Sequence, residues 1–376
     1  MAHLRYYLGP LMTVMGVTGF LLGGSWVWLG VAFFPIYMSL DLLLPPDHAI
    51  RSMKGGLASD LPLYLHVAAI TALYPAFVYS VAAGLNPLQG PGAGWQIAGS
   101  VLTLGWLGAV PNVPVVHELW HRRHWLPQRI GQLCNIFFMD LNRDIGHVKT
   151  HHLHLDTKAD SDTAERGETV YRFAVRATWA GYADAVHSEA ERLRRRGLSP
   201  WNWRNRQYLQ VVLLVGIPTA CGLVAGWQAA TVCVGAMVIG KILAESFNYH
   251  QHYGLQRLPD APVQLHHAWN HLGSIVRPVG FEITNHINHH MDSYTRFHDL
   301  RPEPGAPQMP SIFYCFLIGF VPPLYFAFIA KPRLMEWDRR FATPAERKLA
   351  MAANAKARWP NWLETGSVPA VSTVAH

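Results

Sequence analysis

Long blocks without charge dominate the pattern of hydrophobic and polar positions along the chain. Asp, Glu, Lys and Arg are absent from residues 6–40, 61–116, 207–240 and 311–330. A helix needs about 20 mostly apolar residues to cross a bilayer, because each residue rises about 1.5 Å through a hydrocarbon core about 30 Å thick. Each of the first three blocks is therefore long enough for two spans, and the fourth is not.

Glycine and proline divide each long block into a pair of helices. The breaks fall at Gly23-Gly24, in the run 86–94 and at Gly226. We expect six spans, at residues 5–22, 26–44, 62–83, 94–116, 208–227 and 229–249. In the fourth block, Pro322-Pro323 favours an interfacial or re-entrant hairpin over a seventh span. Buried helices of a soluble protein are the alternative. Only 15% of the residues are charged, against about 25% in soluble domains, which argues against that alternative.

The basic residues predict the orientation of the spans. The three hairpin tips, near Gly23, Pro91 and Gly226, contain no Lys or Arg, whereas the other connections do. Basic loops remain in the cytoplasm, so both termini and the large polar regions are expected there, at a bacterial cytoplasmic (inner) membrane. The net charge of +7 then reflects residues that face lipid headgroups, and no nucleic-acid partner is expected. The cluster Arg192, Arg194, Arg195 and Arg196 is either a solvated helix face or a guide for an acidic electron-transfer partner.

Spans and polar regions divide the chain into five parts. Residues 1–116 hold the first four spans, and 117–206 form a cytoplasmic insert. Residues 207–249 hold the last two spans, 250–366 form a cytoplasmic cap that includes the hairpin 311–330, and 367–376 form a flexible tail. We also expect an amphipathic helix over Tyr171–Arg196 and an Ala-rich helix over Thr343–Arg358.

Histidines recur at helical spacing in the two cytoplasmic parts. Residues three or four positions apart share a helix face, so each cluster can direct its imidazoles at one place. The nine candidate metal ligands are His117, His121, His147, His151, His152, His252, His286, His289 and His290. Imidazole suits iron, zinc, copper and nickel. Nine ligands are too many for one ion and appropriate for two, so we expect a histidine-rich di-metal site in the cap. Polar residues that merely cap interfacial helices would not explain the recurring spacing.

Carboxylates and cysteines refine this expectation. A ligating imidazole usually donates its second N–H to a carboxylate or carbonyl. The nearby candidates for that supporting role are Glu118, Asp144, Asp162, Glu245, Glu282 and Asp292, and each could instead pair with an adjacent Arg. The four Cys residues are isolated, so the sequence predicts no disulfide framework and no fused iron–sulfur module. Electrons must then come from another protein.

The histidine clusters and the element Asn248-Tyr249-His250-Gln251-His252-Tyr253-Gly254 resemble the membrane-bound alkane hydroxylase and xylene monooxygenase family, most closely its aromatic branch. The stretches that carry the resemblance best are 4–8, 117–127, 150–157 and 282–290. It implies a six-helix bundle with a cytoplasmic dome that holds two irons through the nine histidines. It also implies O2 as co-substrate and hydroxylation of an alkylaromatic methyl group (xylene, toluene or p-cymene) to a benzylic alcohol. Electrons would pass from NADH through a separate flavin and [2Fe–2S] reductase.

One departure separates the chain from the branch that oxidises linear alkanes. The stretch Asp144–His152 lacks the Glu before its first His and the Gly before its last pair. That weakens any transfer of linear-alkane specificity or of a rubredoxin partner. A linear-alkane hydroxylase and a membrane lipid desaturase or hydroxylase are the alternatives. A metal-ion transporter is more distant, because transporters bind their ions near the bilayer midplane and these histidines lie at its cytoplasmic edge.

Overall fold

A computed structural model describes residues 2–51, 53 and 55–364 of the chain. Within these ranges the regular structure is helical, and the β-structure is a single bridge between Asn270 and Gln308. The all-α membrane fold that the sequence predicts is confirmed. The predicted tail, residues 367–376, lies outside the described residues.

The apolar blocks fold into the helices of a bundle. Its elements are η1 (Ala2–Tyr7), α1 (Leu8–Leu22), η2 (Gly24–Trp28), α2 (Leu29–Leu43), α3 (Leu57–Ala82), α4 (Ala93–Ala109), α5 (Asn112–Trp120), α10 (Arg206–Ala225) and α11 (Trp227–Gln251). Five helical runs in the described part of the chain are long and apolar enough to cross a membrane. They cover Gly24–Leu43, Leu57–Ala82, Ala93–Trp120, Arg206–Ala225 and Trp227–Gln251.

The first of the six expected spans is shorter than the sequence indicates. Residues 2–7 wind as the 3-10 helix η1, and α1 has only 15 residues, which gives it a length of about 22 Å. Pro10 lies in the first turn of α1, where a residue without an N–H is tolerated because those groups have no partner inside the helix. The α-helix therefore begins near this proline, and α1 alone does not reach across about 30 Å of hydrocarbon.

Glycines end the helices where the sequence predicts hairpin tips. Gly23 has φ +71° between α1 and η2, and a Cβ there would collide with the carbonyl of Leu85. Gly226 has φ +89° between α10 and α11. Positive φ is the region that glycine enters without steric cost. Both turns therefore depend on glycine.

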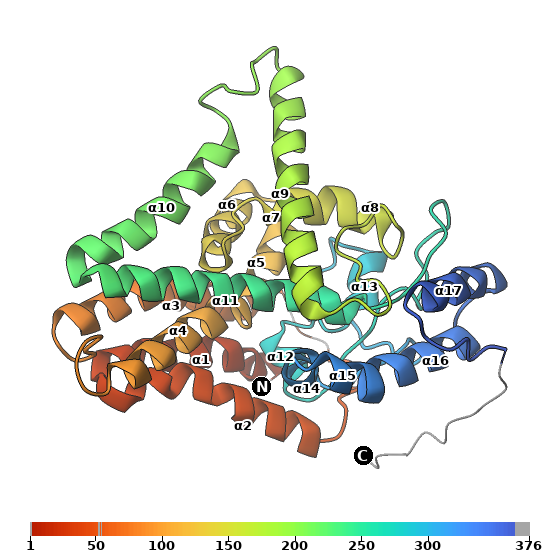
Figure 1. The fold of residues 1–376 in the computed structure, drawn as a ribbon, viewed down its shortest axis with the longest axis horizontal. Coiled ribbons are helices and arrows are strands. Elements are labelled where there is room, and N and C mark those ends of the chain that lie inside the picture. The colour runs from red at the N-terminus through yellow and green to blue at the C-terminus, as the bar shows by residue number, and fades with distance from the viewer. Residues whose placement is uncertain (1, 52, 54, 365–376) are drawn as a thin grey trace.

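In Figure 1 the apolar helices lie together on one side of the molecule, and the polar regions form a cap on the other. The helix α11 runs from the bundle toward the cap and packs along α4. Small residues permit this approach, since a Cβ on Gly105 would lie 2.9 Å from the carbonyl oxygen of Ala236. A Cβ on Gly240 would lie 2.8 Å from the carbonyl oxygen of Phe137.

The cap consists of loops and helices that precede and follow the last two spans in sequence. Most of these helices are short, and α9 (Val170–Arg194) is the longest. Before α10 come α6 (Trp125–Cys134), η3 (Asn135–Phe138), α7 (Arg143–Gly146), η4 (His147–His151), α8 (His152–His154) and α9 (Val170–Arg194). After α11 come α12 (Val276–Val279), α13 (His286–Met291), η5 (Phe297–Asp299), α14 (Ile312–Gly319), α15 (Pro322–Tyr325), η6 (Phe326–Ala330), α16 (Lys331–Arg340) and α17 (Pro344–Lys356). The block 311–330 breaks at Val321 into α14 and α15, as its proline pair predicts.

A buried ion pair joins distant parts of the cap. Arg166, in the loop before α9, donates to both carboxylate oxygens of Asp338 on α16 at 2.6 and 2.7 Å, and both side chains are fully buried. The same guanidinium donates to Asn354 on α17 at 2.9 Å and to the carbonyl of Gly254 at 2.9 Å. One arginine thus ties α16 and α17 to the end of α11.

We expect Asp338→Ala to destabilise the folded protein strongly, because it leaves the buried Arg166 charge without its negatively charged partner. Breaking such a pair typically costs about 3–5 kcal/mol. Glu165→Ala is the matched control, since it removes the exposed ion pair between Glu165 and Lys356, which should contribute less than about 1 kcal/mol. Thermal unfolding of both detergent-solubilised variants measures the difference, and equal midpoints would show that Arg166 does not hold the cap.

Candidate metal centre

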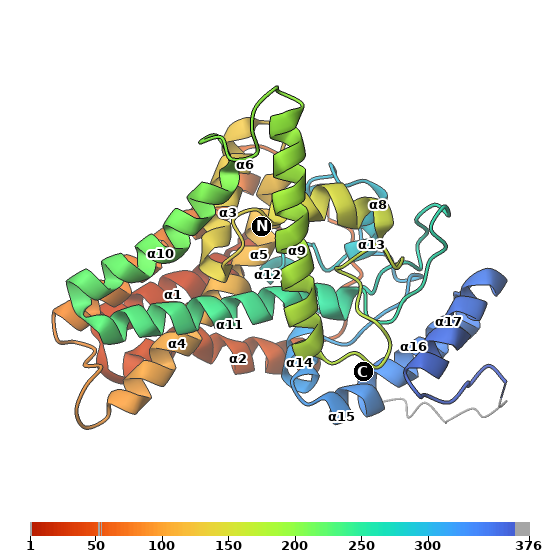
Figure 2. The ribbon, with the colours of Figure 1, turned by 45° about the horizontal axis from the view of Figure 1, so that its top comes forward.

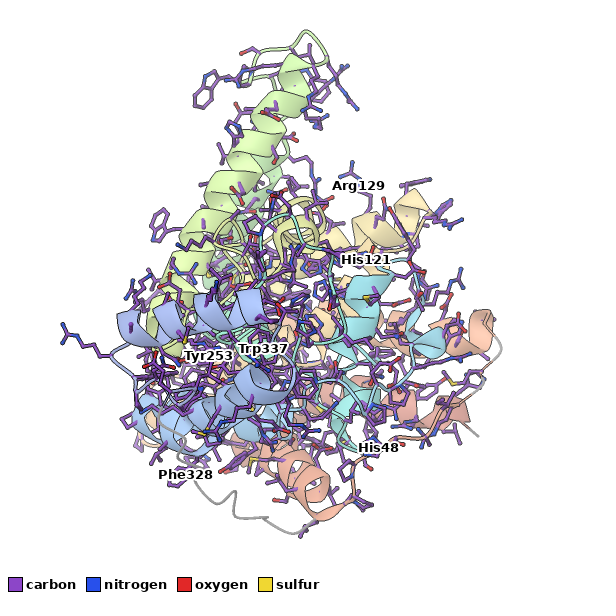
Figure 3. All side chains as sticks on the ribbon, turned by 90° about the vertical axis from the view of Figure 1, so that its right-hand side faces the viewer. His48, His121, Arg129, Tyr253, Phe328 and Trp337 are labelled. Atoms are coloured by element: carbon purple, nitrogen blue, oxygen red, sulfur yellow. The ribbon has the colours of Figure 1, made fainter. Side chains whose placement is uncertain are left out.

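Four segments of the chain deliver the nine histidines to one place. His117 and His121 lie one turn apart at the end of the α4–α5 run. His252 follows α11 directly, and α13 carries His286, His289 and His290. The remaining three are His147, His151 and His152 at η4 and the start of α8. Figure 3 looks onto the cap and shows His121 inside it.

The segment η4 is a π-helix, and its wider turn decides which of its histidines point in the same direction. The backbone N–H of His152 bonds the carbonyl of His147, five residues earlier. Residues five apart are therefore stacked in this turn, so His147 and His152 point the same way while His151 points elsewhere. Single π-turns of this kind occur often at functional sites.

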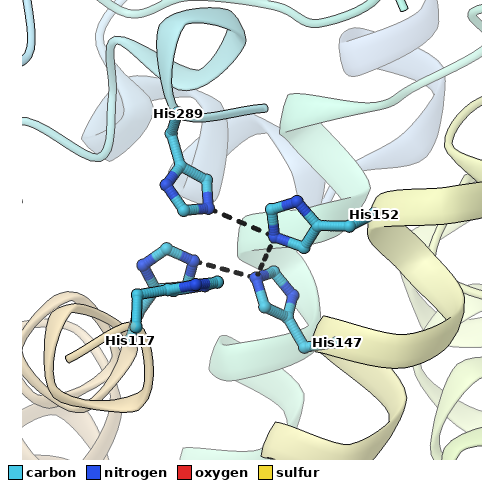
Figure 4. Close-up of side chains that lie close together, drawn as sticks. His117, His147, His152 and His289 are labelled. Atoms are coloured by element: carbon cyan, nitrogen blue, oxygen red, sulfur yellow. Dashed lines mark hydrogen bonds between the residues drawn. The ribbon is translucent and has the colours of Figure 1, made fainter. Parts of the chain in front are cut away.

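The first set of rings, called group one, contains His117, His121, His147, His152 and His289. Figure 4 shows four of these rings, those of His117, His147, His152 and His289, with their nitrogens facing one another. The Nε2 atom of His147 lies 2.9 Å from Nε2 of His117 and 3.2 Å from Nε2 of His152. The latter atom lies 3.2 Å from Nε2 of His289. The Nε2 atom of His121 is buried and has no hydrogen-bond partner.

The second set, called group two, contains His151, His252, His286 and His290. The Nε2 atom of His286 lies 2.7 Å from Nε2 of His252 and 3.1 Å from Nε2 of His290. The Nε2 atom of His151 is buried without a partner. The groups are adjacent, since the rings of His152 and His290 are 4.6 Å apart between centroids. The structure therefore brings all nine predicted histidines together, as two neighbouring groups.

This geometry fits a pair of metal ions. A nitrogen ligand lies about 2.0–2.1 Å from a small divalent cation, so two neighbouring ligands are about 3 Å apart. The Nε2 pairs of both groups are separated by 2.7–3.2 Å. The orphaned nitrogens of His121 and His151 point to the same conclusion, because a buried ring nitrogen without a partner is costly unless a cation occupies the space before it. These residues can bind metal.

Burial keeps most of these rings neutral, as metal ligation requires. It lowers the pKa of His152 to about 2, and the neighbouring His151 and His121 lower it further. The pKa values of His147, His252, His286, His289 and His290 are also lowered well below the usual value, first by burial and then by other rings. At neutral pH such rings keep their lone pairs available to a cation.

One buried aspartate hydrogen-bonds a ring of group two from behind, and a second lies close to another ring. The Nδ1 atom of His151 bonds Oδ2 of Asp160 at 2.9 Å, and each side chain is 1% exposed. The Nδ1 atom of His252 lies 3.3 Å from Oδ1 of Asp156, but neither atom has a hydrogen-bond partner. Carboxylates in this position fix the orientation of a ligating ring and raise its basicity. Sequence reasoning missed both, although Asp156 and Asp160 stand only four and eight residues beyond His152.

Five of the six carboxylates that the sequence nominates for this role bind cationic side chains instead. No hydrogen bond or ion pair described in the structure joins any of the six to a ring nitrogen of the nine histidines. The five partnerships are Glu118 with Arg122 at 2.9 Å, Asp144 with Arg206 at 2.9 Å, Asp162 with Arg143 at 3.1 Å, Glu245 with Lys241 at 2.7 Å and Glu282 with Arg277 at 2.7 Å. Asp292 is exposed and accepts from Thr295 at 2.9 Å. Asp162 acts one step further out, since its backbone N–H donates to Asp160 at 2.9 Å.

A third cluster of His and Glu has a different character. His267 accepts the backbone N–H of Gln264 at Nδ1, so its own hydrogen must be on Nε2, which donates to Glu346 at 2.7 Å. His266 bonds the same carboxylate at 3.0 Å. Glu346 also closes the capping box of α17 with Thr343. Because the Nε2 atom of His267 holds a proton, this cluster joins two parts of the cap and is no third metal site.

An apolar cavity opens beside both groups. Its volume is about 30 Å³, and it is partly open to solvent. The lining consists of Val113, His117, Trp120, Phe138, Arg143, His147, Ala244, Phe247, Asn248, Gln251, Ile283 and His286. Ligand candidates from group one and group two thus share a wall with aromatic and aliphatic side chains from α5, η3 and α11.

Known proteins are similar in sequence to this chain over most of its length. Residues 93–303 match the fatty acid desaturase family. The chain is 54% identical to the xylene/toluene monooxygenase hydroxylase component of Pseudomonas putida, over 97% of this chain and 98% of that protein. It is 28% identical to alkane 1-monooxygenase 1 of Pseudomonas aeruginosa, over 68% of this chain and 69% of that protein.

The alkane 1-monooxygenase of Ectopseudomonas oleovorans is 26% identical, over 83% of this chain and 77% of that protein. The resemblance drawn from the histidine clusters is thereby confirmed. This membrane protein belongs to the fatty acid desaturase family, within its group of xylene and alkane monooxygenases.

Proposed function

We propose that this chain is the hydroxylase component of a di-iron monooxygenase, which uses O2 to convert a methyl group on an alkylaromatic (toluene, a xylene or p-cymene) into a benzylic alcohol. The observation that carries the proposal is the convergence of nine histidines into two adjacent groups beside an apolar cavity. The relative that is 54% identical, a xylene/toluene hydroxylase component, supports the substrate class.

The nine histidines are the proposed ligands of two irons. His117, His121, His147, His152 and His289 would hold one ion, and His151, His252, His286 and His290 the other. Imidazole ligands suit iron. If bound, two irons would supply the oxidising power for O2 and the C–H bond, and the protein would supply position, an apolar cavity and ligand electronics. Asp160 would hold the ring of His151 in the orientation that ligation needs.

The cavity is the proposed substrate site. A small alkylbenzene has no polar group to orient it, so packing must place its methyl group, at about 25 cal/mol for each Å² of apolar surface buried. Trp120, Phe138 and Phe247 provide flat aromatic surfaces, and His117 and His286 bring both metal positions to the same wall. The cavity lies between α5 and α11, both within apolar spans, which supports entry of a substrate dissolved in the bilayer.

Electrons must reach this site from a separate protein. The four cysteines are buried, and the clusters of potential metal ligands among the described residues include none of them. The 54% identical relative is named as a component, which supports a separate reductase. We propose an NADH-dependent flavin and [2Fe–2S] protein that approaches from the cytoplasm. The basic connections support a cap on the cytoplasmic side of an inner membrane, with both termini inside.

A lipid desaturase or a linear-alkane hydroxylase is the competing function, because the same family contains both kinds of protein. Membranes that contain the chain and a supplied reductase should oxidise toluene, xylenes or p-cymene with NADH and O2. Product analysis with fatty-acyl lipids and octane in parallel distinguishes the competing functions. Turnover of those substrates, without turnover of the alkylbenzenes, would contradict the aromatic assignment.

His151→Ala should abolish turnover and lower the iron content below one ion per chain. The change removes a group-two ligand and its bond to Asp160. Metal analysis of the purified protein and NADH-dependent oxidation of toluene provide the two measurements. His187→Ala is the control, because that imidazole is exposed on α9 and its described contact is an ion pair with Glu191. Normal iron content in the His151 variant would remove this residue from the ligand set.

Asp160→Asn should weaken iron binding by about 10- to 100-fold, the usual effect of losing a carboxylate behind a ligating histidine. The shape of the side chain is retained, but the charge facing His151 is lost. Iron retention during titration with a chelator measures the effect. Asp292→Asn, at an exposed carboxylate that accepts from Thr295, should leave retention unchanged. Equal retention in both variants would contradict the supporting role of Asp160.

Phe247→Leu should shift substrate preference toward larger alkylbenzenes, because Phe247 lines the cavity and packs edge-on against Phe316. We expect the ratio of kcat/KM for p-cymene to that for toluene to rise about tenfold, the range that one or two methylene groups provide in an apolar pocket. The ratio cancels differences in iron loading. Phe328→Leu, at an exposed phenylalanine of η6, serves as control. An unchanged ratio would place the substrate elsewhere.

A further inference from the structure

The helix α9 carries an apolar stripe that the protein does not cover. Val170, Phe173, Ala177 and Ala185 face the interior. A neighbouring face presents the exposed Tyr171, Val175, Trp179 and Val186, at spacings of four, four and seven residues. This spacing aligns them along one side of the helix. Val175 is 61% exposed and Trp179 is 72% exposed.

The depth of α9 matches the edge of the hydrocarbon layer. About 20 residues of α11 cross about 30 Å, so a span that begins at Trp227 reaches the opposite boundary near residue 246. The helix α9 crosses α11 at this level. The Nζ atom of Lys241 lies 5.3 Å from the ring centroid of Tyr182, and the ring centroids of Phe173 and Tyr249 are 5.5 Å apart. In Figures 1 and 2, α9 lies across the direction of the spans. It therefore runs along the plane of the membrane.

Both ends of the stripe continue into other apolar surfaces. At one end the hydroxyl of Tyr171 donates to the carbonyl of Phe320 at 2.7 Å, which joins α9 to the α14–α15 break. There Val321, Leu324 and Phe328 are exposed, and Phe328 lies at the edge of the molecule in Figure 3. At the other end the link 195–205 leads into α10, a span with little of its surface buried in the protein.

The link between α9 and α10 has the composition of a headgroup layer. Trp201 is 82% exposed and Trp203 is 78% exposed. The exposed Arg194, Arg195 and Arg196 precede them, and Arg204 stacks on Trp203 at 5.1 Å. Tryptophan prefers the membrane interface, and arginine there attracts anionic headgroups. A soluble partner would not account for the continuity of this surface with the lipid-facing side of α10.

We infer that α9 and the link 195–205 form an in-plane membrane anchor. In this arrangement Val175, Trp179 and Val186 enter the boundary between headgroups and acyl chains, while the arginines of the link bind anionic phospholipid headgroups. The anchor also bears on the metal centre, because α9 packs against α7, and the helix turn after α7 is η4 with its histidines.

Spin labels test the position of the stripe. The iron-loaded chain, with Trp179→Cys labelled by a nitroxide, is placed in nanodiscs of phosphatidylcholine with phosphatidylglycerol. The label should relax faster with O2 than with a water-soluble nickel chelate. A label at His187→Cys, on the polar side of α9, should show the reverse. Loss of O2 access only when reductase is added, or only at high protein concentration, would assign the stripe to a protein contact and overturn the proposal.

Lipid binding tests the arginines. Native mass spectrometry from the same nanodiscs should show phosphatidylglycerol retained on the unaltered protein. The joint replacement of Arg194, Arg195 and Arg196 by Gln should lower that retention by about tenfold or more, since each charge near the surface contributes to anionic lipid binding. Arg340→Gln, at an exposed arginine of α16 paired with Glu336, is the matched control. Equal retention in both variants would overturn the headgroup assignment.

Discussion

Nine imidazoles that must share a small buried volume impose the strongest constraint on this fold. A buried polar nitrogen is stable only when something satisfies it. Here the rings of group one and group two mostly face one another, with Nε2 pairs separated by 2.7–3.2 Å. The arrangement makes chemical sense around two cations, and the spans, the π-turn η4 and the Arg166 pair with Asp338 all hold those rings in place.

Much of this organisation can be predicted from the sequence, because it depends on short-range periodicity. Runs without charge locate the spans, Gly23 and Gly226 locate the turns, and spacings of three to five residues identify the histidine clusters. The first span is the exception. Pro10 in the first turn of α1 limits the α-helix to 15 residues, and a count of apolar residues does not distinguish 3-10 from α geometry.

The supporting carboxylates could not be predicted, because irregular loops decide which way they face. Asp160 and Asp162 are two residues apart, yet the first reaches His151 and the second reaches Arg143. Asp156 has φ +57°, a backbone conformation that few residues other than glycine adopt. Proximity in sequence to a histidine is therefore a poor guide here. Cationic side chains, some near in sequence and some distant, bind five of the six nominated carboxylates.

The short helix α13 contributes to both groups, with His289 in one and His286 and His290 in the other. The η4–α8 segment is divided in the same way, with His151 in group two and with His147 and His152 in group one. An ion in either position therefore immobilises two segments that also form the second position. Occupancy of the two positions is thermodynamically linked, and the linkage is equal in both directions. A cation bound at one position would order the two shared segments and so change the affinity of the other position.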